Sequence, residues 1–238
     1  MKTLLLKFAG PLQSWGTNSH FESRYTDFYP SKSAVIGMVA ASFGYRRKED
    51  EKIQKLNELD FAIRIDQPGN LLKDFHVAQK YKNNGQLEKN YVTNRYYLED
   101  AIFLVALSHK EEDFILNIAE ALRNPYFQTF LGRRSLPINN DFILDITNEG
   151  AIKSLESYAW QASEWYKKRN KSSIINLELI ADSDLLDNCP KNLRKDRVLS
   201  FSQKERKFAF RYESNAYTSI NNKNSEETNH DIFGYIGE

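Results

Sequence analysis

The 238-residue sequence predicts an α+β fold, in which helices lie against a mostly antiparallel sheet. Short apolar segments with strand-like alternation recur along the chain, and helical segments separate the first of them. A long polar segment between two of these strands carries an Asn-Gly turn typical of a β-hairpin. Because 41% of the residues are hydrophobic, the chain can bury a substantial core as a globular protein.

The first strand is expected over residues 1–8, where apolar side chains alternate with Thr and Lys. Gly10-Pro11 ends it, because proline cannot donate to a strand ladder. Ser31 and Ser33 are both suitable N-caps for an almost wholly apolar helix over residues 34–41. A helix of this composition must be buried.

The start of this helix is a candidate anion site. Its first backbone amides have no partner within the helix, and the helix dipole is positive at this end. Lys32 and Ser33 stand beside these amides and would add a cation and a hydroxyl donor. The same pattern also fits a capped core helix with a solvated lysine, which is the commoner arrangement.

The middle of the chain completes a recognisable order of elements. We expect a helix over 49–59, a strand over 60–66, a hairpin over 71–98 with Asn83-Asn84-Gly85 near its tip, a strand over 101–107 and a helix over 111–123. This is the β-α-β-β-α order of a ferredoxin-like (RRM-like) unit in which a thumb-like hairpin is inserted before the third strand.

The remainder of the chain is less regular. Paired arginines follow a glycine in Gly132-Arg133-Arg134, and we expect a short strand over 142–144, a helix over 151–168 and strands over 173–180 and 207–213 that form a second small sheet. The predicted parts are a domain over 1–140, a helix with a small β-rich region over 141–213, and a loosely held polar tail over 214–238.

Composition narrows the class of protein. Cys189 is the single cysteine, which excludes an internal disulfide framework, and neither a signal segment nor a long apolar run is present, so we expect a cytoplasmic protein that does not contact membranes. The net charge is +1, but a basic segment over 191–211 carries Lys191, Arg194, Lys195, Arg197, Lys204, Arg206, Lys207 and Arg211 against Asp196 and Glu205. A local basic surface of this kind suits a polyanion.

The sequence offers little conventional catalytic chemistry. The four histidines are widely spaced, and no zinc, nucleotide-cofactor or hydrolase motif is present, so we expect no metal and no cofactor. His76 is the strongest catalytic candidate, since metal-independent RNA cleavage needs a base for the 2′-hydroxyl and a cation for the phosphate, which nearby lysines and tyrosines could supply. A hairpin histidine that only stacks or hydrogen-bonds is commoner.

Nucleic-acid binding has broader support. The hairpin interleaves cations with aromatic rings, in Lys73, His76, Lys80, Tyr81, Lys82, Lys89, Tyr91, Arg95, Tyr96 and Tyr97, a mixture suited to phosphate contact and base stacking. An ordinary solvated hairpin would also fit. The paired arginines Arg133 and Arg134 could clasp a phosphate, although a salt-bridged loop is commoner. The strand over 101–107 lacks the aromatic signature of an RNA-recognition module, so RNA is not expected on the sheet face.

Seven ordered motifs carry a family resemblance. They are Gly10-Pro11-Leu12-Gln13-Ser14-Trp15-Gly16, Phe21-Glu22-x-Arg24-x-Thr26, Tyr29-Pro30-Ser31-Lys32-Ser33-Ala34-Val35-Ile36-Gly37, Asp74-Phe75-His76, Arg95-x-Tyr97-Leu98-x-Asp100-Ala101, Leu131-Gly132-Arg133-Arg134-Ser135-x-Pro137 and Arg197-Val198-Leu199-Ser200-Phe201. In sequence and order they resemble the CasD family of type I-E CRISPR Cascade subunits, which belongs to the RAMP group. The resemblance spans about residues 3 to 213.

The resemblance implies a non-catalytic subunit that serves antiviral defence. Such proteins hold the 5′ handle of the CRISPR RNA, cap the filament of backbone subunits and contact the large subunit, and they meet target DNA only indirectly through the complex. A separate subunit cuts the RNA in type I-E systems. A related subtype uses its CasD-like protein as the nuclease, so a metal-independent repeat-RNA endonuclease using His76 is the first alternative, and a generic ferredoxin-like protein-interaction module is the second.

The resemblance also implies where RNA is bound. The handle is expected at the loop that carries Gln13, Trp15 and Arg24 and at the helix start with Lys32 and Ser33. The hairpin, with His76, Lys80 and Arg95, would insert against the neighbouring backbone subunit and the RNA. Arg133 and Arg134 are secondary RNA-binding candidates.

Overall fold

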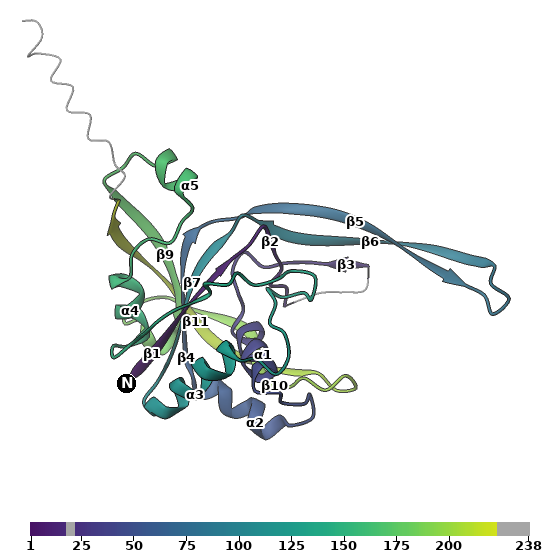
Figure 1. Cartoon of the computed structure of the whole chain (residues 1–238), viewed down its shortest axis with the longest axis horizontal. Helices are drawn as coiled ribbons and strands as arrows, with labels where there is room; N and C mark the ends of the chain where they lie inside the picture. The colour runs from purple at the N-terminus through teal and green to yellow at the C-terminus, as the bar shows by residue number, and fades with distance from the viewer. Residues whose placement is uncertain (18–21, 223–238) are drawn as a thin grey trace, which may run out of the picture.

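The computed structural model describes residues 1–17 and 22–222, and a seven-stranded antiparallel sheet forms its centre (Figure 1). The strand order is β10-β11-β9-β4-β7-β1-β8. The bounds are β1 (Lys2–Ala9), β4 (Asp60–Gln67), β7 (Ile102–His109), β8 (Ile143–Thr147), β9 (Ile174–Asp182), β10 (Lys191–Ser200) and β11 (Lys207–Asn221). The expected mixture of helices with antiparallel strands is confirmed.

A second, smaller sheet carries the hairpin. It consists of β2 (Leu12–Gln13), β3 (Ser23–Arg24), β5 (Asn70–Tyr81) and β6 (Leu87–Glu99). β6 pairs with all three others, antiparallel with β2 and β5 and parallel with β3. The predicted hairpin is confirmed, and its turn contains Gly85 at a φ of 80° in open space.

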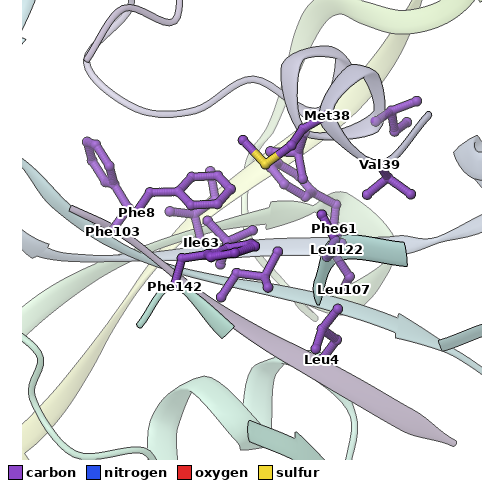
Figure 2. Packing of buried hydrophobic residues seen from close by; sticks show 14 of the residues in the cluster. Leu4, Phe8, Met38, Val39, Phe61, Ile63, Phe103, Leu107, Leu122 and Phe142 are labelled. Atoms are coloured by element: carbon purple, nitrogen blue, oxygen red, sulfur yellow. The ribbon is translucent and has the colours of Figure 1, made fainter. Parts of the chain in front are cut away.

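Helices cover both faces of the large sheet. They are α1 (Lys32–Ser42), α2 (Asp50–Lys55), α3 (Glu112–Arg123), α4 (Ala151–Ser157) and α5 (Glu164–Arg169), with short 3-10 turns η1 (Leu56–Glu58) and η2 (Ser183–Leu185). The main core packs α1 and α3 against one face, where Leu4, Phe8, Val39, Phe61 and Leu122 interdigitate (Figure 2). α4 covers the other face around Leu5 and Leu155. None of the helices in residues 1–17 and 22–222 is long and apolar enough to cross a membrane.

The expected second small sheet is wrong. β9, β10 and β11 continue the central sheet, because β9 pairs with β4 as well as with β11. β11 also extends through Asn221, so the first residues of the expected tail belong to a strand, whereas residues 223–238 lie outside the described residues. The segment 191–200, for which no strand is predicted from the sequence, is the edge strand β10.

The expected continuous helix over 151–168 is also wrong, because a buried ion pair captures the backbone that would continue it. Arg64 is fully buried beside Asp66, with Nε 2.6 Å from Oδ1. Its Nη1 donates to the carbonyls of Leu155 and Tyr158, and its Nη2 donates to that of Ala159. These carbonyls accept from Arg64 in the arrangement in which helix α4 ends at Ser157, so the side chain satisfies backbone groups that a longer helix would pair internally.

Candidate nucleic-acid interface

The β5–β6 hairpin is a long arm that leaves the body of the protein (Figure 1). Only its base is anchored in the core, through Leu72, Tyr97 and Leu98. Further out it exposes large apolar side chains, including Phe75, which is 69% exposed. A two-stranded hairpin is only marginally stable in isolation, and exposed apolar surface on it indicates a binding role.

The strand register gives the arm two chemically different faces. Residues opposite each other share a face, so one face carries the pairs His76 with Thr93, Asp74 with Arg95, Ala78 with Tyr91, and Lys80 with Lys89. The other face carries Lys73 with Tyr96, Phe75 with Asn94, and Val77 with Val92. We call these the basic face and the apolar face. Phosphate contacts suit the first, and apolar contacts suit the second.

An arginine cluster forms where the basic face meets the body. Arg24 on β3 lies opposite Arg95 on β6, and Arg133 reaches both strands. Its Nη2 donates to the carbonyl of Arg24 at 2.9 Å and to that of Tyr96 at 3.1 Å, while the guanidinium lies 4.4 Å from the centre of the Tyr97 ring. The structure thus brings together three predicted residues that are distant in sequence.

Two donors of this cluster have no acceptor within the described residues. Arg95 Nε and Arg133 Nη1 are buried without a hydrogen-bond partner in the part of the chain that the structure describes. A buried unpaired donor costs about 1–3 kcal/mol, and more when the group is charged. An anion that turns these guanidinium groups toward itself would recover that cost, so the cluster is suited to a phosphate.

The glycine-centred loop is held against the first loop of the chain. Gly132 has a φ of 88°, and a Cβ atom there would lie 1.7 Å from the carbonyl oxygen of Ser14. The amide of Ser14 donates to the carbonyl of Leu131 at 3.2 Å. Only glycine allows this approach, which places Arg133 over Tyr97. Arg134 is exposed beside it.

Gln13 and Trp15 are buried and organise the loop from inside. Gln13 Nε2 donates to the carbonyls of Phe8 and Ala101, and its Oε1 accepts from Trp15 Nε1 at 3.0 Å. The indole stacks on Phe8 with ring centres 5.5 Å apart. Neither side chain presents a polar atom to a ligand, so the expected direct RNA contact is replaced by a structural role.

The helix start with Lys32 and Ser33 needs a correction of the same kind. Lys32 is 6% exposed, and its Nζ donates to Asp182 at 2.8 Å and to the carbonyl of Leu59 at 2.6 Å. Its backbone amide donates to Asp196 Oδ2 at 2.9 Å. The anion at the helix start is therefore a carboxylate of the protein itself. Ser33 is buried, and its hydroxyl lies 3.2 Å from that of the N-cap Ser31.

Two arginines of the predicted basic segment belong to the same buried network. Arg211 contacts Asp182 at 3.0 Å and Asp196 at 2.6 Å, and Arg194 contacts Asp27 at 2.9 Å. Burial raises the pKa of the Asp27 carboxyl, an effect that the nearby Arg194 opposes. The other cations of the segment stay exposed: Lys191, Lys195, Arg197, Lys204, Arg206 and Lys207.

Tyr29 lies at the edge of this network. Its hydroxyl donates to Glu213 at 2.7 Å, and burial raises the pKa of the phenol well above its usual value, so it stays protonated. The network joins α1, β9, β10 and β11, and Lys32, Arg194 and Arg211 each contact carboxylates within it. Lys32, Arg194 and Arg211, whose residue types suggest ligand binding when only the sequence is considered, therefore stabilise the fold.

The outer arm residues are accessible. His76 and Lys80 are exposed on the basic face, and Lys80 forms a surface ion pair with Glu88 at 2.8 Å. An exposed pair of this kind contributes little to stability, so Lys80 remains available to a phosphate. Among residues 1–17 and 22–222 no cluster of three His, Cys, Asp or Glu side chains could hold a metal.

Sequence reasoning missed one pair of rings. Tyr25 stacks on Tyr96 with centres 5.1 Å apart, and Lys73 Nζ lies 5.9 Å from the centre of the Tyr96 ring. Tyr25 follows the motif residue Arg24, but its partner across the sheet becomes visible only when β3 is paired with β6. Phe21 and His20, which the expected loop includes, lie outside the described residues.

Residues 3–212 match the sequence profile of a family described as CRISPR-associated protein (Cas_Cas5). A curated relative, the CRISPR system Cascade subunit CasD of Escherichia coli (strain K12), is 30% identical over 155 residues, which cover 59% of this chain and 69% of that protein.

Solved structures with a similar fold also come from CRISPR-associated proteins. One chain of a CRISPR RNA-guided surveillance complex superposes with a TM-score of 0.77 at 30% identity, covering 99% of this chain and 100% of that one. A crystal structure of a Cas protein superposes with a TM-score of 0.63 at 29% identity, covering 93% and 96%.

Proposed function

The chain belongs to the Cas5 family of CRISPR-associated proteins, and from this premise we propose that it is a Cascade subunit that binds the 5′ handle of the CRISPR RNA without cutting it. The resemblance inferred from ordered motifs over about residues 3–213 is confirmed by the family match over residues 3–212. The arginine cluster of Arg24, Arg95 and Arg133, with its two donors that lack an acceptor among the described residues, is the observation that carries the RNA-binding proposal.

The two faces of the arm suit two different partners. We assign RNA to the basic face, which leads directly into the arginine cluster, and a neighbouring backbone subunit to the apolar face around Phe75, Val77 and Val92. The large subunit and, through the complex, target DNA complete the proposed set of partners. An end-capping role fits a protein whose arm reaches away from its body (Figure 1).

We further propose that the body contains a ferredoxin-like unit. Its four strands would be β1, β4, β7 and β8, which lie in the order β8-β1-β7-β4 with each strand antiparallel to its neighbours. α1 and α3 pack on the same face of these strands. The arm leaves the unit between β4 and β7, where the sequence predicts the insertion.

The RNA-binding site is tested by Arg24→Ala and Arg95→Ala. Each substitution should weaken binding of an RNA with the handle sequence about tenfold, because it removes a charged donor to phosphate. The slope of log affinity against log salt should fall by about one for each variant. Fluorescence anisotropy at several salt concentrations measures both quantities. Unchanged affinity and slope in both variants would show that the RNA does not bind at this cluster.

Lys32→Met is the matched control, because it removes a cation that is buried. The substitution should leave handle affinity within about twofold of the unmodified protein while lowering the free energy of unfolding by about 3 kcal/mol, because it removes one of the two cations that contact Asp182 and the donor to the carbonyl of Leu59. Urea unfolding and anisotropy on the same preparation test it. A loss of RNA affinity in the fully folded variant would show that the helix start contributes to RNA binding.

The repeat-RNA endonuclease remains the competing function. His76 is exposed on the basic face beside Arg95 and Tyr91, so an acid-base residue and a cation share one surface. We propose binding without cleavage, and incubation of the purified chain with repeat RNA in EDTA tests it. The RNA should stay intact. A product with a defined 3′ end that disappears in His76→Ala would establish the nuclease instead.

A further inference from the structure

We propose that this chain has a second nucleic-acid-binding surface, which takes a single-stranded segment and lies away from the arm. It consists of the loop after α1 (residues 45–48), the aromatic pair Tyr126 and Phe127, and the loop between β10 and β11 (residues 200–207). We call it the distal surface. It is additional to the handle site proposed above.

The distal surface holds the excess positive charge of the chain. The loop after α1 with the start of α2 (residues 45–52) and the loop over 200–207 together contain seven lysines and arginines and four acidic residues, whereas the whole chain has a net charge of +1. The rest of the sequence is therefore net negative. Two of the four acids, Glu49 and Glu205, are paired with Lys52 and Lys207. Such a concentration of charge attracts a polyanion.

A hollow of about 410 Å³ joins the two loops. Three lysines line it, Lys48, Lys204 and Lys207, together with the polar residues Gln54, Ser200 and Ser202, the acids Asp50 and Glu205, and Leu199. Asp50 Oδ1 is buried and lacks a hydrogen-bond partner among residues 1–17 and 22–222. The hollow thus offers cations for phosphate and an acceptor for a donor, a combination that matches the phosphate and the base or ribose of a nucleotide.

An aromatic pair flanks the loop that enters this hollow. Tyr126, which is 66% exposed, meets Phe127 edge to face with ring centres 4.7 Å apart. The Arg46 guanidinium lies 5.7 and 5.2 Å from the two ring centres, and Gly44, at a φ of 78°, lets the backbone pass close to Tyr126. Exposed rings next to cations suit unpaired bases, whereas the bases of a duplex are already stacked on each other.

The distal surface and the arginine cluster lie in different parts of the molecule. The first follows the C-terminal end of α1 and includes the loop that joins β10 to β11, whereas the second lies at the base of the arm formed by β5 and β6 (Figure 1). Their occupation can therefore be separated by substitution.

The test uses the full chain and a labelled oligo-dT of about 12 nucleotides, within the range of one single-strand site. Lys48→Glu combined with Lys204→Glu should weaken binding at least about tenfold and lower the salt slope by about two. The control is Lys110→Glu combined with Lys153→Glu, which changes the net charge equally at two exposed positions elsewhere and should change affinity less than about twofold. Tyr126→Leu keeps apolar contact with Gly44 and should weaken binding several-fold with an unchanged slope.

Any of three results would overturn the proposal. Absence of oligo-dT binding at low salt, equal loss in the control pair, or unchanged affinity in the Lys48/Lys204 variant would each do so. Handle affinity measured in parallel should stay unchanged, and its loss would mean that the two surfaces form one site. If the variant instead fails to join neighbouring Cascade subunits while binding oligo-dT normally, the surface is a protein-docking site. Failure of the Arg24 and Arg95 predictions leaves this test intact.

Discussion

Replacing Arg64 by Met is expected to lower the free energy of unfolding by about 3–5 kcal/mol, one of the two largest effects we predict for a single substitution in this chain. Arg64 and Asp66 are both fully buried, and Nη2 lies 2.8 Å from Oδ2 in addition to the Nε contact. The substitution leaves a buried carboxylate without its cation and removes the Arg64 donors from three backbone carbonyls.

Urea unfolding measures this loss of unfolding free energy, and two further variants test its cause. Arg123→Ala removes an exposed arginine at the end of α3 and should change the free energy of unfolding by less than about 0.5 kcal/mol. Arg64→Met combined with Asp66→Leu should be more stable than Arg64→Met alone, because no charge is left buried without a partner. A cost below about 1 kcal/mol for Arg64→Met would show that the pair does not hold the segment after α4.

This ion pair also shows why one predicted helix failed. The stripe of Ile152, Leu155, Ala159 and Ala162 has helical spacing, and local sequence favours one helix. The group that interrupts it, Arg64, lies about ninety residues earlier on β4 and acts only after the sheet has formed. Local periodicity therefore predicted β1, α1, β4, the arm, β7 and α3, whose hydrophobic pattern is set by their own residues, but not a break imposed by tertiary contact.

The candidate site was predictable to a similar extent. Sequence motifs identified Arg24, Arg95 and Arg133, and pairing of β3 with β6 brings them together. The same motifs also selected Lys32 and Gln13, which are buried. Residue type alone does not distinguish an arginine or lysine that meets a ligand from one that meets a buried carboxylate, since both need charge and hydrogen bonding. The carboxylates that decide the matter, Asp182 and Asp196, are distant in sequence.

Gly132→Ala is expected to disrupt the loop that supports Arg133. The left-handed φ of 88° costs an alanine about 1–2 kcal/mol, and the clash with the Ser14 carbonyl adds a further cost of about 1–3 kcal/mol. The backbone cannot yield freely, because Ser14 donates to Leu131 in the same contact. We expect a total loss of about 3 kcal/mol in the free energy of unfolding.

Gly85→Ala separates the clash from the backbone conformation. Gly85 has a φ of 80°, but no atom lies within 4 Å of its would-be Cβ, so only the conformational cost of about 1 kcal/mol applies. Handle affinity should be unchanged in Gly85→Ala and at least about tenfold weaker in Gly132→Ala, measured below its unfolding temperature, because the second substitution displaces Arg133 from Tyr97 and from the carbonyls of Arg24 and Tyr96. If Gly132→Ala unfolds more easily yet binds the handle normally while folded, Arg133 organises the loop but does not contribute to the RNA site.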